Sequence, residues 1–171
     1  MAPVHSGVAT PGLLRRLASL LYDTILVTAL LMGATAVLLP LTDGEAIPSL
    51  GRVATIAYQA YLLAVVFAFF AWCWIRGGQT LGMRAWRLHV RTADQAPLNL
   101  PDAARRFGAA LLLWTPLALI LLAGHRAGLL AYAGPPVAAL FLASLGTRRR
   151  PGWHERLSGT RVVMTPKHVP D

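Results

Sequence analysis

The sequence predicts an all-α membrane protein with four transmembrane helices and a small cytoplasmic loop and tail element that can form short β-strands. Of its 171 residues, 56% are hydrophobic and only 13% are charged, whereas roughly 25% are charged in an average soluble domain. The charges are grouped between long apolar runs, which is typical of membrane proteins. A soluble domain needs a more polar surface, so we expect residues 1–171 to form one membrane domain.

Four apolar runs define the expected spans. A transmembrane helix needs about 20 residues, with a range of about 17 to 25. The runs cover residues 17–41, 53–75, 107–123 and 127–145. Only Gly124, His125 and Arg126 separate the last two runs, so we expect an antiparallel hairpin whose tilt accommodates the short third span.

The positive charges predict the orientation of these spans. The net charge is +9, and 16 residues are Lys or Arg. Fourteen of them fall in the N-terminal segment, in the loop 76–106 or in the tail 146–171, and two fall in the other connections. Because positively charged loops stay in the cytoplasm, we expect a multi-pass protein of a bacterial inner membrane with both termini in the cytoplasm. The same charges predict contact with anionic lipid headgroups.

The loop 76–106 contains a predicted strand. Three glycines mark turns at its start. From Trp86 onward, apolar residues alternate with arginine and histidine, which is the period of a half-buried strand. The later segment "LNL" is a second candidate strand, and "PDAARRF" suits the start of the third span with Pro101 at the first helical position. Two roles for the alternating segment stay open: contact with lipid phosphates, or a lid that contacts substrate.

The tail contains the densest group of chemically versatile residues: Trp153, His154, Glu155, Arg156 and Ser158. An adjacent histidine and carboxylate can act as an acid–base pair, but neither a nucleophile nor a metal-ligand spacing accompanies them. We therefore expect no enzyme activity, and we interpret the segment as a docking element that folds back under the helices. Its continuation "SGTRVVM" can pair as a strand with "WRLHV" of the loop.

Nothing in the sequence predicts a metal, a cofactor or nucleic acid. Cys73 is the only cysteine, so neither an intrachain disulfide nor a C-x-x-C metal site can form. No nucleic-acid recognition module accompanies the basic charge. Trp72 and Trp74 lie near the end of the second span, where we expect them to anchor the helix at the membrane interface.

Three segments resemble the RDD family of small integral membrane proteins: "LLRRLASLLYDTILV", "GGQTLGMRAWRLHV" and "WHERLSGTRVV". They extend over nearly the whole chain, so the resemblance implies a single RDD-like domain. The family is named after one arginine and two aspartates, and Arg16 and Asp23 match the first two. Glu155 stands where the second aspartate is expected, which keeps the charge and changes its reach. The resemblance implies an integral membrane protein, with ligand transport proposed for the family and cation/proton exchange for some members.

Asp23 lies within the first span, where a charge is costly. It is two turns from Arg16 on the same helix face, at a rise of about 10 Å. An unpaired charge at the centre of a span costs about 2.5 to 3.5 kcal/mol, so Asp23 should face the protein interior. Three roles stay open: a fixed pair with a loop arginine, a titrating carboxylate that exchanges a proton for a cation, and a substrate contact. The arginines available for such a pair are Arg84, Arg87 and Arg106.

The sequence leaves two functions open. In the first, the protein transports a small ligand or exchanges a monovalent cation for a proton through Asp23, with Arg16 and Glu155 as further transport residues. In the second, it is a non-transporting scaffold or accessory subunit in which the same residues and the tail motif are structural. Four spans make a small transporter, so we expect a homo-oligomer or a partner membrane protein.

Overall fold

The computed structural model describes residues 11–42, 47–127 and 152–164. Most of these residues are helical, and they include one small sheet, as predicted. In chain order the elements are α1 (Leu13–Leu38), η1 (Leu39–Leu41), η2 (Ile47–Leu50), α2 (Arg52–Gly77), α3 (Leu81–Ala85), β1 (Leu88–Thr92), α4 (Leu100–Ala127), α6 (Trp153–Ser158) and β2 (Thr160–Met164).

Two helical segments are long and apolar enough to cross a membrane: Leu13–Thr42, which contains α1 and η1, and Arg52–Gly77, which is α2. Their apolar side chains are largely uncovered; Met32 is 70% exposed and Val53 is 82% exposed. The core helix of a soluble protein buries such side chains against other elements, whereas lipid covers them in a membrane. The two segments match the first and second expected spans.

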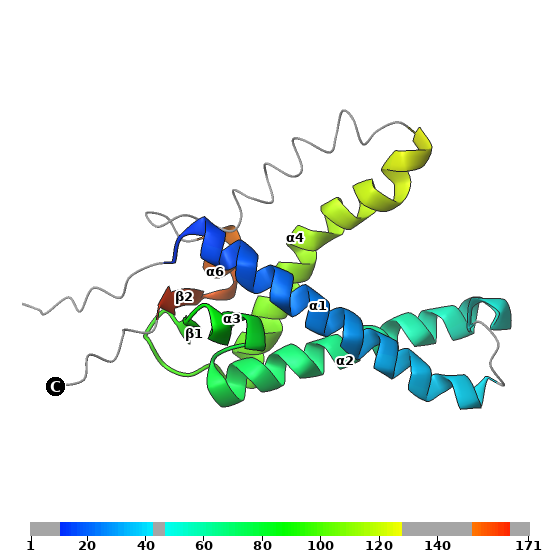
Figure 1. Ribbon diagram of the computed structural model, residues 1–171, viewed down its shortest axis with the longest axis horizontal. Helices are drawn as coiled ribbons and strands as arrows, with labels where there is room; N and C mark the ends of the chain where they lie inside the picture. Colours follow the sequence, from blue (N-terminus) through cyan, green and yellow to red (C-terminus); the bar gives the residue numbers. More distant parts are fainter. Residues whose placement is uncertain (1–10, 43–46, 128–151, 165–171) are drawn as a thin grey trace, which may run out of the picture.

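α1 and α2 cross each other (Figure 1) and are joined by hydrogen bonds in the half that lies away from the loop. The hydroxyls of Thr35 and Tyr58 are 2.7 Å apart, and Tyr61 Oη donates to the carbonyl oxygen of Ala34 at 3.3 Å. Each bond satisfies a polar group that lipid cannot satisfy. The pair of helices is therefore held by polar contacts as well as by packing.

The third and fourth expected spans are not confirmed as membrane crossings. The third, 107–123, lies within α4, but α4 is not one of the two helices that meet the criteria for a crossing within the described residues. The fourth, 127–145, lies outside the described residues except for Ala127, the last residue of α4. Both crossings stay predictions.

The start of α4 is defined by a reciprocal cap. Asn99 Oδ1 accepts a hydrogen bond from the backbone N–H of Asp102 at 2.9 Å, and Asp102 Oδ2 accepts one from the N–H of Asn99 at 3.2 Å. Two otherwise unpaired backbone donors are thereby satisfied. The cap places Leu100 at the first helical position, so the prediction that Pro101 occupies it is wrong by one residue.

We use the name loop assembly for residues 78–99 and 152–164, which contain α3, β1, α6 and β2. Figure 1 shows these elements together, beside the start of α1, the end of α2 and the start of α4. Within this arrangement α3 packs against α1, and α6 packs against α4. The predicted folding of the tail back onto the helices is thus present in the structure.

β1 and β2 form a two-stranded antiparallel sheet in which Val90 lies opposite Val162. This confirms the predicted pairing of the tail with the loop strand. The segment "LNL" is not a strand, because Leu98 is buried in the core and Asn99 caps α4.

α3 is an element that the sequence analysis did not predict. It forms where Thr80 Oγ1 accepts a hydrogen bond from the backbone N–H of Met83 at 3.1 Å and so caps the helix. Just before it, Gly78 ends α2 with a φ of 63°, which glycine adopts without strain. Arg87, with a φ of 56°, turns the chain after α3. β1 therefore begins at Leu88, two residues after the predicted start, and Trp86 lies outside the strand.

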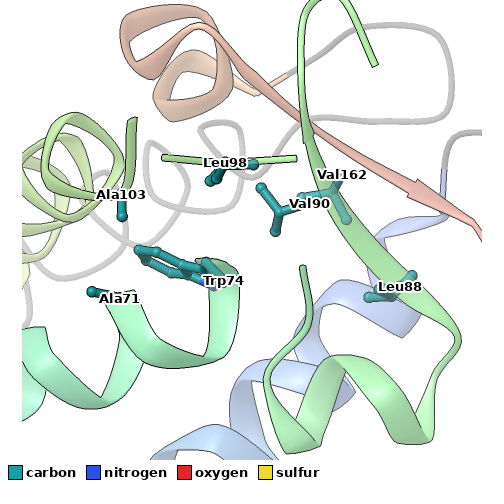
Figure 2. Packing of buried hydrophobic residues seen from close by; sticks show 7 residues of the cluster. All are labelled: Ala71, Trp74, Leu88, Val90, Leu98, Ala103 and Val162. Carbon is teal, nitrogen blue, oxygen red and sulfur yellow. The ribbon is translucent and has the colours of Figure 1, made fainter. Parts of the chain in front are cut away.

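A small hydrophobic core joins the loop assembly to α2 and α4. Its buried members are Ala71, Trp74, Leu88, Val90, Leu98, Ala103 and Val162. Figure 2 shows the ring of Trp74 between Ala71 and Ala103. Because Trp74 is only 5% exposed, the prediction that it anchors α2 at the membrane interface is wrong, whereas Trp72 is 62% exposed and remains available for that role.

Candidate functional site

Arg16 and Asp23 lie on the face of α1 that is turned toward the rest of the protein. Each is 5% exposed, and Ser19, between them on the same face, is 3% exposed. Leu14 and Tyr22, on other faces of the helix, are exposed. The two charged residues that match the family signature therefore point toward the loop assembly.

Arg16 forms a buried ion pair with Glu155 of α6. The distance between Arg16 Nη1 and Glu155 Oε1 is 2.6 Å, and both side chains are almost fully buried. Glu155 also accepts hydrogen bonds from the backbone N–H groups of Gly152 and Val162, each at 3.2 Å. A buried ion pair is tolerated when the remaining lone pairs of its carboxylate are also satisfied. Glu155, in place of the expected aspartate, accepts hydrogen bonds with both carboxylate oxygens.

Arg106 also contacts the loop assembly. It lies near the start of α4, before the third expected span. Its Nη1 donates to Thr160 Oγ1 at 2.6 Å, and its guanidinium carbon lies 5.2 Å from the centre of the Trp74 ring. Burial lowers the pKa of Arg106 to about 10; the Glu155 charge opposes this shift and the Arg16 charge adds to it. Arg106 therefore stays protonated at neutral pH and ties α4 to β2.

Asp23 receives its hydrogen bonds from the segment that begins α3. Thr80 Oγ1 donates to Asp23 Oδ2 at 2.6 Å, and the backbone N–H of Gly82 donates to Asp23 Oδ1 at 3.0 Å. A Cβ on Gly82 would lie 2.3 Å from the carbonyl oxygen of Ser19 and 2.8 Å from Asp23 Oδ1. The absence of a side chain at this position is what lets α3 approach α1 closely enough for these bonds.

The interpretation that Asp23 is paired with a loop arginine is wrong for the described residues. Arg84 and Arg87 are exposed, and the ion pairs of the described chain are Arg16–Glu155 and Arg105–Asp102. The partners of Asp23 are a hydroxyl and a backbone N–H. The physical reason is that α3 presents its capping end to α1 and directs its arginine to the surface.

Sequence reasoning missed three residues of this region: Thr80, Gly82 and Thr160. The signal for the first two was the segment "GGQTLG", in which the glycines predicted turns and the threonine was not recognised as a helix cap. A threonine directly before a helix is a recognisable N-cap, because its Oγ1 can accept a hydrogen bond from the backbone N–H three residues later. No local signal predicts that Thr160 accepts a hydrogen bond from Arg106, because the two are 54 residues apart.

The remaining predicted site residues, Trp153, His154 and Arg156, all belong to α6. Arg156 is exposed on α6. Trp153 and His154 begin α6, but their side chains lie outside the described part of the structure. Within the residues that the structure describes, no group of three His, Cys, Asp or Glu side chains lies close enough to hold a metal ion.

A cavity of about 520 Å³ lies between α1, α2 and α4 and reaches the loop assembly. Its walls are mostly apolar side chains, among which leucine is the most frequent. Its polar lining includes Thr24, Gln59, Thr80 and two charged residues, Asp23 and Arg106. Asp23 is thus both a contact between helices and part of a cavity wall. This arrangement can hold an apolar molecule with one polar group, or water around a titrating carboxylate.

A family model described as the RDD family matches residues 10–159. No curated protein and no solved structure matches the chain. The matched region includes α1, α2, α4 and α6, and within it Arg16, Asp23 and Glu155.

Proposed function

The chain belongs to the RDD family, and we propose that it is a membrane scaffold or accessory subunit without transport or enzyme activity of its own. In this function, α1 and α2 hold the protein in the membrane and position the loop assembly at its surface. The loop assembly then presents a fixed shape to a second copy or to another membrane protein.

The observation that carries this proposal is that the three residues at the signature positions have partners within the protein. Arg16 and Glu155 join the start of α1 to the tail, and Asp23 joins α1 to the start of α3. All three are buried. Buried polar groups with satisfied hydrogen bonds fix one packing arrangement, which is what a scaffold needs.

The proposed location is a bacterial inner membrane, with the loop assembly and both termini in the cytoplasm. The support is the distribution of Lys and Arg, fourteen of which fall on the side of the loop and the two ends. Fusion of a reporter that is active only outside the cytoplasm, placed after Asp171, tests this orientation. Activity of that reporter would contradict it.

Ion flux measured with Asp23→Asn tests the scaffold proposal. The purified chain is reconstituted into vesicles, and flux is followed for several monovalent cations with and without a pH gradient. We expect wild-type flux to equal that of protein-free vesicles. We also expect Asp23→Asn to fold, because its amide can accept from the N–H of Gly82 and donate to Thr80 Oγ1, at a cost of about 1 kcal/mol.

Asp23→Ala is the matched structural variant. It leaves the hydroxyl of Thr80 and the N–H of Gly82 without their partner, so we expect a loss of about 2 to 3 kcal/mol of stability. If the wild type carries a cation against protons, and Asp23→Asn removes this flux while the variant stays folded, the scaffold proposal is wrong.

The cavity favours a second candidate function, in which the protein carries a small ligand or exchanges a cation for a proton at Asp23. This carboxylate lines the cavity and has no cationic partner among the described residues. In that case Ala110→Phe, which fills the cavity, also abolishes flux, whereas Ala68→Phe on the exposed side of α2 leaves it intact. Equal flux in both variants excludes the cavity as the path.

A further inference from the structure

We propose that the segment 72–87 binds the phosphate headgroups of anionic phospholipids at the membrane surface. We use the name headgroup surface for six of its exposed residues: Trp72, Arg76, Leu81, Arg84, Trp86 and Arg87. The proposal concerns a surface outside the Arg16, Asp23 and Glu155 contacts. It holds for a scaffold and for a transporter alike.

The headgroup surface alternates large apolar side chains with arginines. Trp72 is 62% exposed, Leu81 is 54% exposed and Trp86 is 36% exposed, and each has an exposed arginine within four residues along the chain. Apolar side chains of this kind enter the boundary between headgroups and acyl chains, while basic side chains beside them remain at the phosphates. Water does not offer a favourable environment for the apolar half of this surface.

Trp72 and Arg76 already adopt an arrangement suited to the membrane interface. The guanidinium carbon of Arg76 lies 4.4 Å from the centre of the Trp72 ring. Stacking on the ring orients the guanidinium and leaves the N–H groups at its edge able to donate. A guanidinium binds a phosphate through two parallel N–H bonds, and tryptophan is enriched at the level of the headgroups.

The orientation of α3 directs its apolar and basic residues away from the protein. Gly82 is buried against α1, whereas its neighbour Leu81 is exposed, and Arg84 is exposed one turn later. α3 follows directly after the end of α2, a helix that is long enough to cross a membrane. Its exposed residues are therefore placed where a bilayer surface is expected.

The arginines of the headgroup surface are not neutralised by the carboxylates of the same region. Asp23 and Glu155 are buried and hydrogen-bonded within the protein, and Asp102 pairs with Arg105 and caps α4. In the described part of the chain, Arg84 and Arg87 take part in no ion pair, and neither does the exposed carboxylate of Asp94. The surface is consequently positive, and charge complementarity selects anionic lipids over zwitterionic ones.

Native mass spectrometry of the full chain in neutral detergent tests this proposal. Phosphatidylglycerol and phosphatidylcholine are titrated separately, and bound lipids are counted. We expect tighter binding of phosphatidylglycerol, which weakens as salt is added. Each arginine near a membrane surface contributes about 1 kcal/mol, or about fivefold in affinity, so Arg84→Gln with Arg87→Gln should weaken phosphatidylglycerol binding roughly 25-fold.

Two controls make the result specific. Arg52→Gln removes an exposed arginine at the opposite end of α2 and should leave phosphatidylglycerol binding unchanged. Arg84→Lys with Arg87→Lys keeps the charges and should retain most of the binding. Circular dichroism confirms that each variant is folded; if the double glutamine variant unfolds, the salt dependence of the wild type decides the outcome.

The proposal is overturned if the two lipids bind equally, or if the double glutamine variant binds phosphatidylglycerol like the wild type. It is also overturned if Arg52→Gln causes the same loss. Displacement of the lipid by inorganic phosphate at an equal concentration would show a site for free anions, with no role for the membrane.

Discussion

Single polar side chains in the loop assembly satisfy several partners at once. Glu155 accepts hydrogen bonds from Arg16 and from two backbone N–H groups. Thr80 donates to Asp23 and accepts from the N–H of Met83. Burying a charged or polar group costs less free energy when it has hydrogen-bond partners within the protein. These positions therefore depend on side-chain length and direction as well as on charge.

Gly82→Ala tests the close approach of α3 to α1. The new Cβ would lie 2.3 Å from a backbone oxygen, that of Ser19, and a backbone atom cannot move aside easily. Overpacking of this kind costs about 1 to 3 kcal/mol, and we expect the melting temperature to fall accordingly in a thermal unfolding experiment.

Gly108→Ala is the matched control for this substitution. A Cβ on Gly108 meets no atom within 4 Å, and alanine favours a helix over glycine by about 0.5 to 1 kcal/mol. We expect Gly108→Ala to be neutral or stabilising. Equal melting temperatures for the two variants would show that α3 does not rest on α1 as described.

Among the elements, β1 depends on the connection that precedes α3. Gln79 Nε2 donates to the carbonyl oxygen of Leu88 at 2.9 Å and lies 2.7 Å from His89 Nδ1. Because an amide N–H can only donate, this contact requires Nδ1 of His89 to accept, which the neutral ring can do. The end of α2 is thereby linked to the first two residues of the strand.

This linkage predicts that the protein loses stability in mild acid. Burial lowers the pKa of His89 below its ordinary value of 6.5, and the charge of Arg91 acts in the same direction. Below pH 6.5 the unfolded chain binds a proton that the folded protein resists, so stability falls as the pH falls through this value. Above it, His89 contributes no pH dependence.

The measurement is the melting temperature above and below pH 6.5, compared between the wild type and His89→Gln. The variant retains a polar side chain that does not titrate, so the difference between the two proteins isolates His89 from the other histidines. An identical pH dependence in both proteins would contradict the predicted contribution of His89.

At the scale of the whole molecule, one buried ion pair joins α1 to α6, which are far apart in the sequence. Arg16 and Glu155 are 139 residues apart, and their contact brings the tail to the first helix. α6 also packs against α4, and β2 pairs with β1. The tail segment formed by α6 and β2 is thus held in place by contacts with α1, α4 and β1.

Glu155→Gln should therefore destabilise the whole protein. It leaves the guanidinium of Arg16 buried without its countercharge, and breaking a buried pair in this way costs about 3 to 5 kcal/mol. We expect a lower melting temperature and faster proteolysis of the tail. Replacing both Arg16 and Glu155 by methionine should cost less, because no unpaired charge remains.

Arg105→Gln serves as the comparison for Glu155→Gln. The side chain of Arg105 is 63% exposed in its pair with Asp102, and an exposed pair contributes about 0 to 1 kcal/mol. If Glu155→Gln were no more destabilising than Arg105→Gln, the pair with Arg16 would not be what holds the tail.

The sequence by itself determined that the protein is mostly helical, which family it belongs to, and the elements that depend on local pattern. The apolar runs that became α1 and α2 are visible because a membrane crossing requires about 20 apolar residues in succession. The alternation around Val90 was equally visible, because a half-buried strand repeats every two residues. The resemblance placed Arg16, Asp23 and Glu155 before any contact was known.

Only the tertiary structure decided what these residues touch. The partner of Asp23 was expected to be an arginine, because charge is evident in a sequence, but it is a hydroxyl and a backbone N–H brought close by Gly82. Trp74 was expected at the membrane interface and lies in the core, because its surroundings come from α4. Such contacts join residues more than 25 positions apart, and their geometry depends on how whole helices pack.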